Sequence, residues 1–278
     1  MLLYYAAGGG LGHVTRARAF LHGARLDGVI LTAAAVEGVD TLVIPEPLRR
    51  DLPAYREWLR GRGAEHIILD TFPAGLFHEF DDLELSCTFD YVARYLAWPR
   101  YAEMRNPPRF ATTYVLEPLH GEQEQFVVAR STHIDRAPKL VDPEVPGGEL
   151  PVESQYSLVV HSGPASEVEE LIDYARMAAK AAGESLPIVV ATRAAIDVGD
   201  VIVVDAYPAT SLANGAVRII TGAGFNCMRQ FGGDPRHHVV PFPRRYDDQF
   251  IRAARVRSYR SSETSIRSNC APSSLTAR

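Results

Sequence analysis

The sequence has few cysteines, no excess of positive charge and no long apolar run. Its three cysteines, Cys87, Cys227 and Cys270, are far apart and show no C-x-x-C spacing. Neither a zinc knuckle nor a disulfide framework is therefore predicted, and a reducing cytoplasm is the expected location. A formal net charge of −5 gives no general attraction to nucleic acid or to an anionic membrane. No apolar run approaches the ~18 residues that span a bilayer, so we predict no transmembrane segment. The protein is expected in the cytoplasm, either free or peripheral at the membrane.

Several signatures of other enzyme classes are also missing. The sequence contains neither H-E-x-x-H nor G-x-S-x-G, and we predict no metal site. The adjacent His237 and His238 are expected in packing or at the surface, because neighbouring residues of a strand point to opposite faces. The acidic cluster Glu167, Glu169 and Glu170 begins a predicted helix, where it would complement the helix dipole and face solvent.

What remains is an ordinary globular composition arranged as two similar halves. Short β-rich runs alternate with helical patterns, which is typical of βαβ units and a mainly parallel sheet. We expect first-half strands at 2–7, 28–33, 41–44, 66–70, 85–89 and 113–116, with helices at 14–26 and 54–62. The pattern restarts with strands at 157–161, 187–191, 201–204, 217–220 and 237–243, and with helices at 167–182 and 246–254.

The boundary between the halves is marked by composition. Residues 143–153 are rich in proline, glycine and acid without periodicity, as in a linker. We therefore predict an N-terminal domain over 1–142, a linker over 143–153, a C-terminal domain over 154–254 and a disordered tail over 255–278, where serine, threonine and arginine prevail.

The first candidate site is a glycine-rich turn between the first strand and the first helix. It comprises Gly8, Gly9, Gly10, Leu11 and Gly12, followed by His13. Glycines let a ligand approach backbone N–H groups, and the helix start offers unpaired donors to an anion or a sugar. The turn is not a dinucleotide fingerprint, because His13 stands where the third glycine would be, and no lysine follows as in a Walker loop. The alternative is a tight turn of any α/β protein.

Two later segments are candidates as well. Thr221-Gly222-Ala223-Gly224-Phe225-Asn226 again follows an apolar run and precedes a predicted helix, so its backbone could bind a diphosphate. The segment 241–253 carries two aspartates and a glutamine, P-F-P-R-R-Y-D-D-Q-F-I-R-A. Taken alone, its carboxylates could simply cap a helix.

Together, the three segments resemble the glycosyltransferase group that includes the UDP-glucuronosyltransferases and the enzyme that adds N-acetylglucosamine to the peptidoglycan lipid intermediate. The resemblance covers a GGxGH loop, an SGxxNT-like loop and a P-x-x-x-D-x-Q segment, over residues 7–18 and 219–254. It implies an α/β fold of the GT-B type, in which two Rossmann-like domains face each other across a cleft. The first domain would bind the acceptor and the second the nucleotide sugar.

The resemblance implies a role for each matched position of the first half. His13 falls on the histidine that in many members is the general base, a role that suits imidazole because its pKa lies near neutrality. The alternative is a histidine that caps the helix or contacts the acceptor without transferring a proton. Asp70 ends a predicted strand where some members hold an acid that orients the histidine, or it caps the next turn. Gly10 and Gly12 would be among the residues that bind the donor and its phosphates.

In the second half the resemblance implies a donor site. Gly222, Gly224, Phe225 and Asn226 match the loop whose N–H groups meet the charge that builds on the departing nucleoside diphosphate.

Asp248 and Gln249 match the acid and amide that hydrogen-bond the donor sugar, and Asp247 is expected to be a solvated neighbour. The sequence departs from the family at Gln230, where a glutamate usually grips the ribose hydroxyls. A neutral amide must donate through its nitrogen, so ribose binding would be arranged differently or lost.

The predicted function is transfer of a sugar from a nucleoside-diphosphate sugar, with a uridine diphosphate donor expected first, to a hydroxyl of a small-molecule, glycan or lipid-linked acceptor. Because no D-x-D occurs, the transfer is expected to be independent of metal, with inversion at the anomeric carbon, and no further cofactor is predicted. The alternatives are a sugar-nucleotide epimerase or hydrolase of the same fold and a non-catalytic nucleotide- or glycan-binding relative. A generic Rossmann oxidoreductase ranks last, since the first turn lacks its third glycine.

Overall fold

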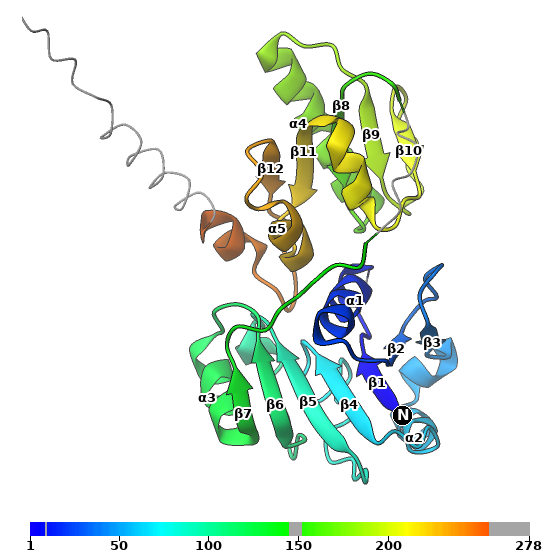
Figure 1. Cartoon of the computed structure of the whole chain (residues 1–278), viewed down its shortest axis with the longest axis vertical. Helices are drawn as coiled ribbons and strands as arrows, with labels where there is room; N and C mark the ends of the chain where they lie inside the picture. The colour runs from blue at the N-terminus through cyan, green and yellow to red at the C-terminus, as the bar shows by residue number, and fades with distance from the viewer. Residues whose placement is uncertain (9, 145–151, 256–278) are drawn as a thin grey trace, which may run out of the picture. The chain divides into compact units, whose positions relative to one another are not determined.

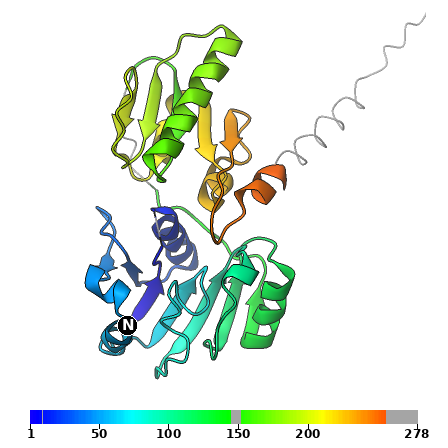
Figure 2. The same ribbon diagram turned by 180° about the vertical axis from the view of Figure 1, so that it is seen from behind.

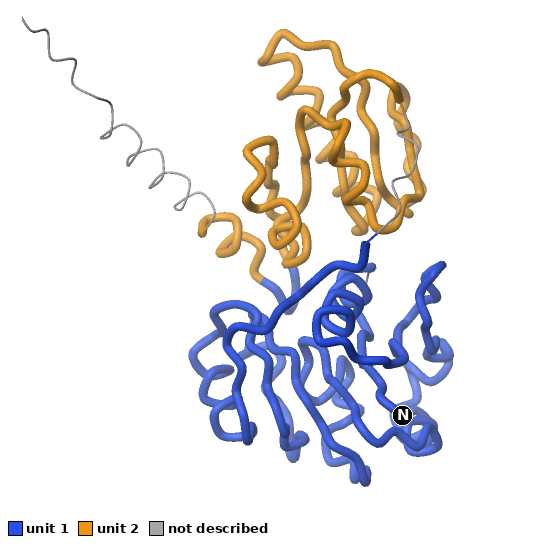
Figure 3. Tube along the Cα trace, viewed as in Figure 1, with its two compact units in different colours: residues 1–148, 244–247 blue, residues 149–243, 248–278 orange. Residues whose placement is uncertain are grey.

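The chain folds as two compact units, seen in a computed structural model that describes residues 1–8, 10–144 and 152–255. The first unit comprises residues 1–148 and 244–247, and the second comprises residues 149–243 and 248–278 (Figure 3). The chain thus returns to the first unit for the four residues 244–247 before it continues in the second unit. The predicted linker 143–153 and tail 255–278 fall mostly outside the described residues.

The first unit is built on a parallel sheet of seven strands in the order β3-β2-β1-β4-β5-β6-β7 (Figure 1). The strands are β1 (Leu2–Tyr5), β2 (Val29–Thr32), β3 (Thr41–Val43), β4 (His66–Asp70), β5 (Thr88–Ala93), β6 (Phe110–Val115) and β7 (Ser131–Asp135). The helices are α1 (Gly12–Ala24), α2 (Leu52–Arg60) and α3 (Gly121–Arg130), with 3-10 turns η1 (Glu46–Arg50) and η2 (Trp98–Arg100). The α2 helix begins after Asp51, whose carboxylate accepts a hydrogen bond from the Ala54 N–H at 3.0 Å.

Both faces of this sheet are covered, which explains why its central strands are mainly apolar. Leu3 and Tyr5 belong to the core cluster that also contains Tyr55 of α2. Tyr4 points to the opposite face, where its ring lies 5.8 Å from that of Phe20 on α1. The alternation fixes the register of β1, because a slip by one residue would exchange the two faces.

The second unit repeats this plan with a five-stranded parallel sheet in the order β10-β9-β8-β11-β12. Its strands are β8 (Tyr156–Val160), β9 (Ile188–Ala191), β10 (Ile202–Val204), β11 (Ala216–Gly222) and β12 (His237–Val240). They are joined by α4 (Ala165–Ala182), the 3-10 helix η3 (Ala209–Gly215) and α5 (Phe225–Phe231), and residues 249–255 form a further helix. Among the described residues no helix is both long and apolar enough to cross a bilayer.

Helices α4 and α5 lie on opposite faces of the second sheet. Figure 1 shows α5 in front of the strands, and Figure 2, from behind, shows α4 in front. The core divides accordingly, since Val159 packs with Leu171 of α4 while its neighbour Leu158 packs with Phe231 of α5. The α4 helix ends at Gly183, whose φ of 68° is the left-handed conformation that glycine adopts without penalty.

The predicted elements are found, but in the first half two elements were missed and one strand was misplaced. Helix α3 and strand β7 were not predicted. Polar residues surround most of α3, and four of the five β7 residues are polar, so β7 lacks the alternation of apolar and polar residues that marks a strand. The strand predicted at 85–89 lies later, as β5 at Thr88–Ala93. The apolar Leu85 and Cys87 that suggested the earlier position instead pack half-buried against the core from a loop.

Each sheet has one point at which successive connections turn in opposite directions. In the first sheet this point lies between β1 and β4, and in the second it lies between β8 and β11. In open α/β sheets, ligands bind outside the carboxyl ends of the strands at such a switch point. We therefore expect the ligand-binding residues among those that directly follow β1, β4, β8 and β11.

Candidate active site

The first glycine turn lies at the carboxyl end of β1, and its shape is adapted to the imidazole of His13. A Cβ added to Gly8 would lie 2.3 Å from both Nε2 and Cδ2 of His13, closer than any real contact. The imidazole therefore occupies the space that any other residue at position 8 would fill. Gly10 has a φ of 76°, a left-handed conformation favoured by glycine. Gly12 is the first residue of α1, and His13 is the second.

His13 and Asp70 are brought together at the switch point of the first sheet. Nδ1 of His13 lies 2.5 Å from Oδ2 of Asp70, the last residue of β4. Asp70 is fully buried, and the side chain of His13 is 11% exposed. Burial lowers the pKa of His13 from its ordinary value, although the hydrogen bond to Asp70 opposes this shift. The roles of base and orienting acid stay predictions, but the distance is the one that they require.

Asp70 also accepts hydrogen bonds from the guanidinium of Arg16, a residue that the sequence patterns did not indicate. Arg16, one turn after His13 on α1, donates from Nε to Oδ1 of Asp70 at 2.6 Å and from Nη2 to Oδ2 at 2.5 Å. Burial by itself raises the pKa of Asp70, yet the Arg16 guanidinium and the imidazole hold it far below the ordinary value. Since Asp70 is thus a carboxylate, it accepts a hydrogen bond from Nδ1–H of His13, which leaves the lone pair on Nε2 for a substrate.

The segment 244–247 contributes a carboxylate to the same region. Asp247, predicted to be a solvated neighbour, is instead buried to 12% side-chain exposure and lies 3.0 Å from Nη1 of Arg94. Arg94 directly follows β5, the strand beside β4. The prediction was wrong because the ion pair joins residues more than 150 positions apart, a distance over which sequence spacing carries no information.

Aromatic rings flank His13 on one side. The Phe72 ring is nearly parallel to the imidazole, with centroids 6.0 Å apart and an angle of 19°. Phe72 in turn contacts Tyr101 and Tyr246, with ring centroids 5.3 and 5.6 Å away. This apolar wall lowers the local dielectric around the dyad, which strengthens its electrostatic interactions.

The second unit has a histidine at its own switch point, also missed from the sequence. His161 follows β8, and its Nε2 lies 2.7 Å from Oε2 of Glu167. A Cβ on Gly163 would lie 2.4 Å from this Nε2, and one on Gly222 would lie 3.2 Å from Cε1 of His161. Glu167 was predicted to face solvent, which is wrong, because its carboxylate binds this ring. A signal was present: His161 takes the place, after the first strand of its half, that the glycine turn takes in the other.

The predicted donor loop begins beside this histidine, at Gly222. Gly222 ends β11, and Gly224 is the N-cap of α5, with open space where a Cβ would be. Phe225 and Asn226 form the first turn of α5, where Asn226 is buried and Phe225 half-buried. Gln230 lies half-buried near the end of the same helix.

Asp248 and Gln249 both take part in local structure. Oδ1 of Asp248 accepts from the Ile251 N–H at 2.9 Å, so this carboxylate caps the helix at 249–255. Oε1 of Gln249 accepts from the Phe242 N–H at 3.1 Å, and it lies 3.5 Å from the position of a Cβ on Gly222. The structure thus brings Gln249, Gly222 and His161 together, whereas their contact with a donor sugar stays a prediction.

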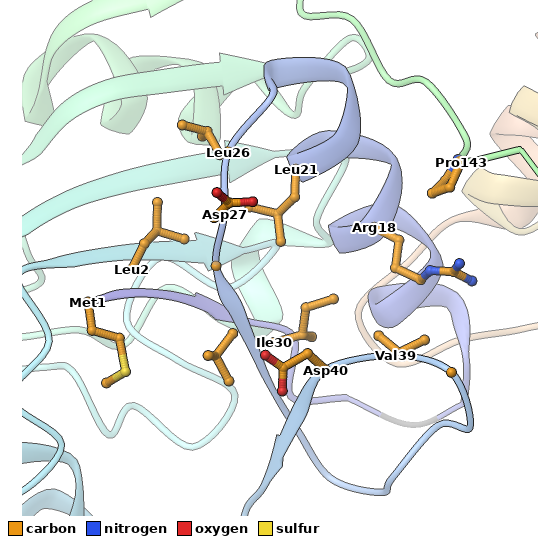
Figure 4. Close-up of a pocket in the computed structure, with 13 residues that line it drawn as sticks. Met1, Leu2, Arg18, Leu21, Leu26, Asp27, Ile30, Val39, Asp40 and Pro143 are labelled. Carbon is orange, nitrogen blue, oxygen red and sulfur yellow. The ribbon is translucent and has the colours of Figure 1, made fainter.

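A cavity of about 540 Å³ opens at the other end of the first sheet (Figure 4). It is lined by Leu2 and Val29, at the amino ends of β1 and β2, and by Arg18 and Asp40. His13 and Asp70 lie at the carboxyl ends of their strands, so this cavity is not the predicted site. Among the described residues no group of three or more His, Cys, Asp or Glu side chains is placed to hold a metal ion.

Two Rossmann-like units, each with a glycine turn at its switch point, define the GT-B class of fold, which confirms the fold implied by the sequence motifs. No protein-family model and no curated protein matches the sequence. Solved structures are similar to it, among them three glycosyltransferases. The glycotransferase of kitacinnamycin has 14% identity and a TM-score of 0.57, covering 92% of this chain and 84% of its own. The spinosyn rhamnosyltransferase SpnG, complexed with thymidine diphosphate, has 13% identity and a TM-score of 0.54, covering 94% and 85%. SsfS6, a glycosyltransferase of Streptomyces sp. SF2575, has 12% identity and a TM-score of 0.50, covering 93% and 85%.

Proposed function

We propose that the protein transfers a sugar from a nucleoside-diphosphate sugar to a hydroxyl group of an acceptor, with inversion and without a metal ion. The observation that carries this proposal is the buried His13–Asp70 pair against the first glycine turn, at 2.5 Å. A GT-B fold alone admits several reactions. A carboxylate-oriented imidazole at this switch point supports one that must remove a proton from a hydroxyl.

The chemistry on the acceptor side follows from the state of each group. Nε2 of neutral His13 accepts the hydroxyl proton as the acceptor oxygen forms its bond to the anomeric carbon. The bond from that carbon to the diphosphate oxygen breaks, and its electron pair leaves with the diphosphate. Asp70 keeps the proton on Nδ1 and stabilises the imidazolium that forms.

The donor side is assigned to the second unit. Gly224 leaves open space through which a ligand can approach the backbone, and His161 is held beside Gly222 by Glu167. When protonated, an imidazole held in this way can donate a second hydrogen bond, through its other ring nitrogen, to the departing diphosphate. We expect a uridine diphosphate sugar first, and the thymidine diphosphate in SpnG makes thymidine donors the second choice.

Analysis of the products by mass spectrometry tests the proposal. The full chain is incubated with uridine, thymidine, guanosine and cytidine diphosphate sugars, each with and without a panel of hydroxyl acceptors. We expect an acceptor whose mass has increased by one sugar residue, together with free nucleoside diphosphate. The reaction without acceptor is the control, and it should release far less diphosphate.

Three outcomes would contradict transfer and identify another function. Release of free sugar at the same rate without acceptor would identify a hydrolase, and conversion of the donor to an isomer an epimerase. Nucleotide binding that raises the melting temperature, with no turnover of any donor over the whole acceptor panel, would identify a binding protein.

A further inference from the structure

We infer that Arg94 and Asp247 are positioning residues for His13, acting through Thr71 and Arg16. This inference rests on the proposed function, in which His13 is the base. It extends the His13–Asp70 pair to a series of side-chain contacts that ends at Asp247, in the segment 244–247. That segment immediately precedes Asp248 and Gln249, the residues predicted to bind the donor sugar.

The chain of contacts passes through a single hydroxyl group. Oγ1 of Thr71 accepts one hydrogen bond from Nη2 of Arg16 at 2.9 Å and another from Nε of Arg94 at 3.0 Å. Arg16 binds both carboxylate oxygens of Asp70, which lies next to Thr71. Because the guanidinium groups are planar and rigid, fixing the position of Arg94 also fixes Arg16 and hence the carboxylate that orients the imidazole.

The backbone at Thr71 is held in an unfavourable conformation. Its φ is 69°, a left-handed conformation that is strained for a β-branched residue. Its N–H donates to the Val92 carbonyl at 3.0 Å, and its carbonyl accepts from the Tyr91 hydroxyl at 2.8 Å. The strain is therefore maintained by bonds from β5, and the result is that the Thr71 hydroxyl lies between the two guanidinium groups.

The charges explain why Asp247 is needed. Two buried cations, Arg16 and Arg94, lie close to His13, and both disfavour its protonated form. Asp70 and Glu117 offset the charge of Arg16, and Asp247, at 3.0 Å from Arg94, offsets that of Arg94. Without Asp247 the net charge of the region would be more positive by one unit, which would resist the transfer of a proton to His13.

The segment that carries Asp247 is anchored in the first unit by neutral contacts as well. The Tyr246 carbonyl accepts from the Ala97 N–H at 3.0 Å, and its ring packs against Phe72 and Tyr101. Nη1 of Arg100 donates to the Arg245 carbonyl at 3.2 Å. These contacts place the Asp247 carboxylate independently of its charge, so an asparagine should keep its location.

The test is an NMR titration of the His13 imidazole in the substrate-free full chain, for Asp247→Asn, Arg94→Gln and the double variant. His13 is surrounded by Asp70, Arg16, Arg94 and the Phe72 ring, and the two variants change this field in opposite directions. We expect Asp247→Asn to lower the pKa of His13 and Arg94→Gln to raise it, each by about half a unit. The double variant should titrate close to wild type, and Asp205→Asn, which breaks the exposed ion pair with Arg193 in the second unit, should change nothing.

Kinetics provide the second readout. Thr71→Val keeps the β-branched shape but removes the shared acceptor, and we expect it to lower kcat at least tenfold while the KM for the donor stays within twofold. Shifts in the same direction for both single variants, or no shift in either, would overturn the inference, and so would a Thr71→Val enzyme with wild-type kcat. The titration requires no substrate, so the opposite shifts can be observed even if the chain transfers no sugar, and the two failures are distinguishable.

Discussion

Replacing His13 with alanine is expected to lower kcat by about 10²–10⁴-fold, the usual contribution of a positioned general base. The side chain lies in the cavity formed by Gly8, so alanine leaves a small void and does not force the turn to move. The loss should therefore appear in kcat, with the KM for the donor changed less than threefold. Steady-state kinetics with the best donor and acceptor from the product screen measure both values.

The chain offers a matched control for this variant. His66 begins β4 and pairs with Asp90, with Nε2 2.9 Å from Oδ2, at the opposite end of the same strand from Asp70. His66→Ala removes a histidine from a similar pair and should leave kcat unchanged. Wild-type turnover in His13→Ala would remove His13 from catalysis, whatever the control shows.

Replacing Asp70 with asparagine should damage both activity and stability. An amide N–H facing Nδ1 of His13 would favour the tautomer with the proton on Nε2, which cannot accept a proton from a substrate. We expect kcat to fall about 10²–10⁴-fold for this reason. The variant also leaves the Arg16 guanidinium, with a side-chain exposure of 3%, without its carboxylate, and breaking such a buried pair costs about 3–5 kcal/mol of unfolding free energy.

Urea unfolding followed by tryptophan fluorescence measures the stability, and rates are normalised to the folded fraction. Asp90→Asn is the matched control. It alters the second histidine–aspartate pair, between His66 of β4 and Asp90 of β5, and should lower stability without lowering kcat. Asp70→Glu separates charge from shape, since it keeps the carboxylate and should restore part of the stability. An Asp70→Asn protein that is folded and as active as wild type would exclude the orienting role.

The sequence indicated the fold because its elements repeat with clear punctuation. A glycine turn follows the first strand of the first half, another follows β11 of the second half, and apolar runs mark the buried parallel strands between them. Strand β7 and helix α3 were not predicted because they lie at the edge of the first sheet, where exposed residues such as Thr132 and His133 need not be apolar. The position of β5 was misjudged since Leu85 and Cys87 are apolar but lie in a loop.

The candidate site was predictable where a motif carried it and hidden where only the fold assembles it. His13 stands within a glycine motif, and Asp70 ends a strand, so both could be named from the sequence. Arg94, Thr71 and Asp247 come from three separate segments that meet through parallel pairing of β4 with β5 and through the return of the chain to the first unit. No local pattern distinguishes these three residues from surface polar residues.

The central claim is that neutral His13, oriented by Asp70, accepts the proton of the acceptor hydroxyl. The pH dependence of kcat/KM tests it most directly, because it reports the essential base of the free enzyme. Burial lowers the pKa of His13 below 6.5, its ordinary value, and only the neutral ring can accept a proton. Activity should therefore rise with pH along an acid limb whose midpoint lies below 6.5, and the limb should disappear in the residual activity of His13→Ala. A midpoint well above 6.5, or the same limb in His13→Ala, would contradict the account.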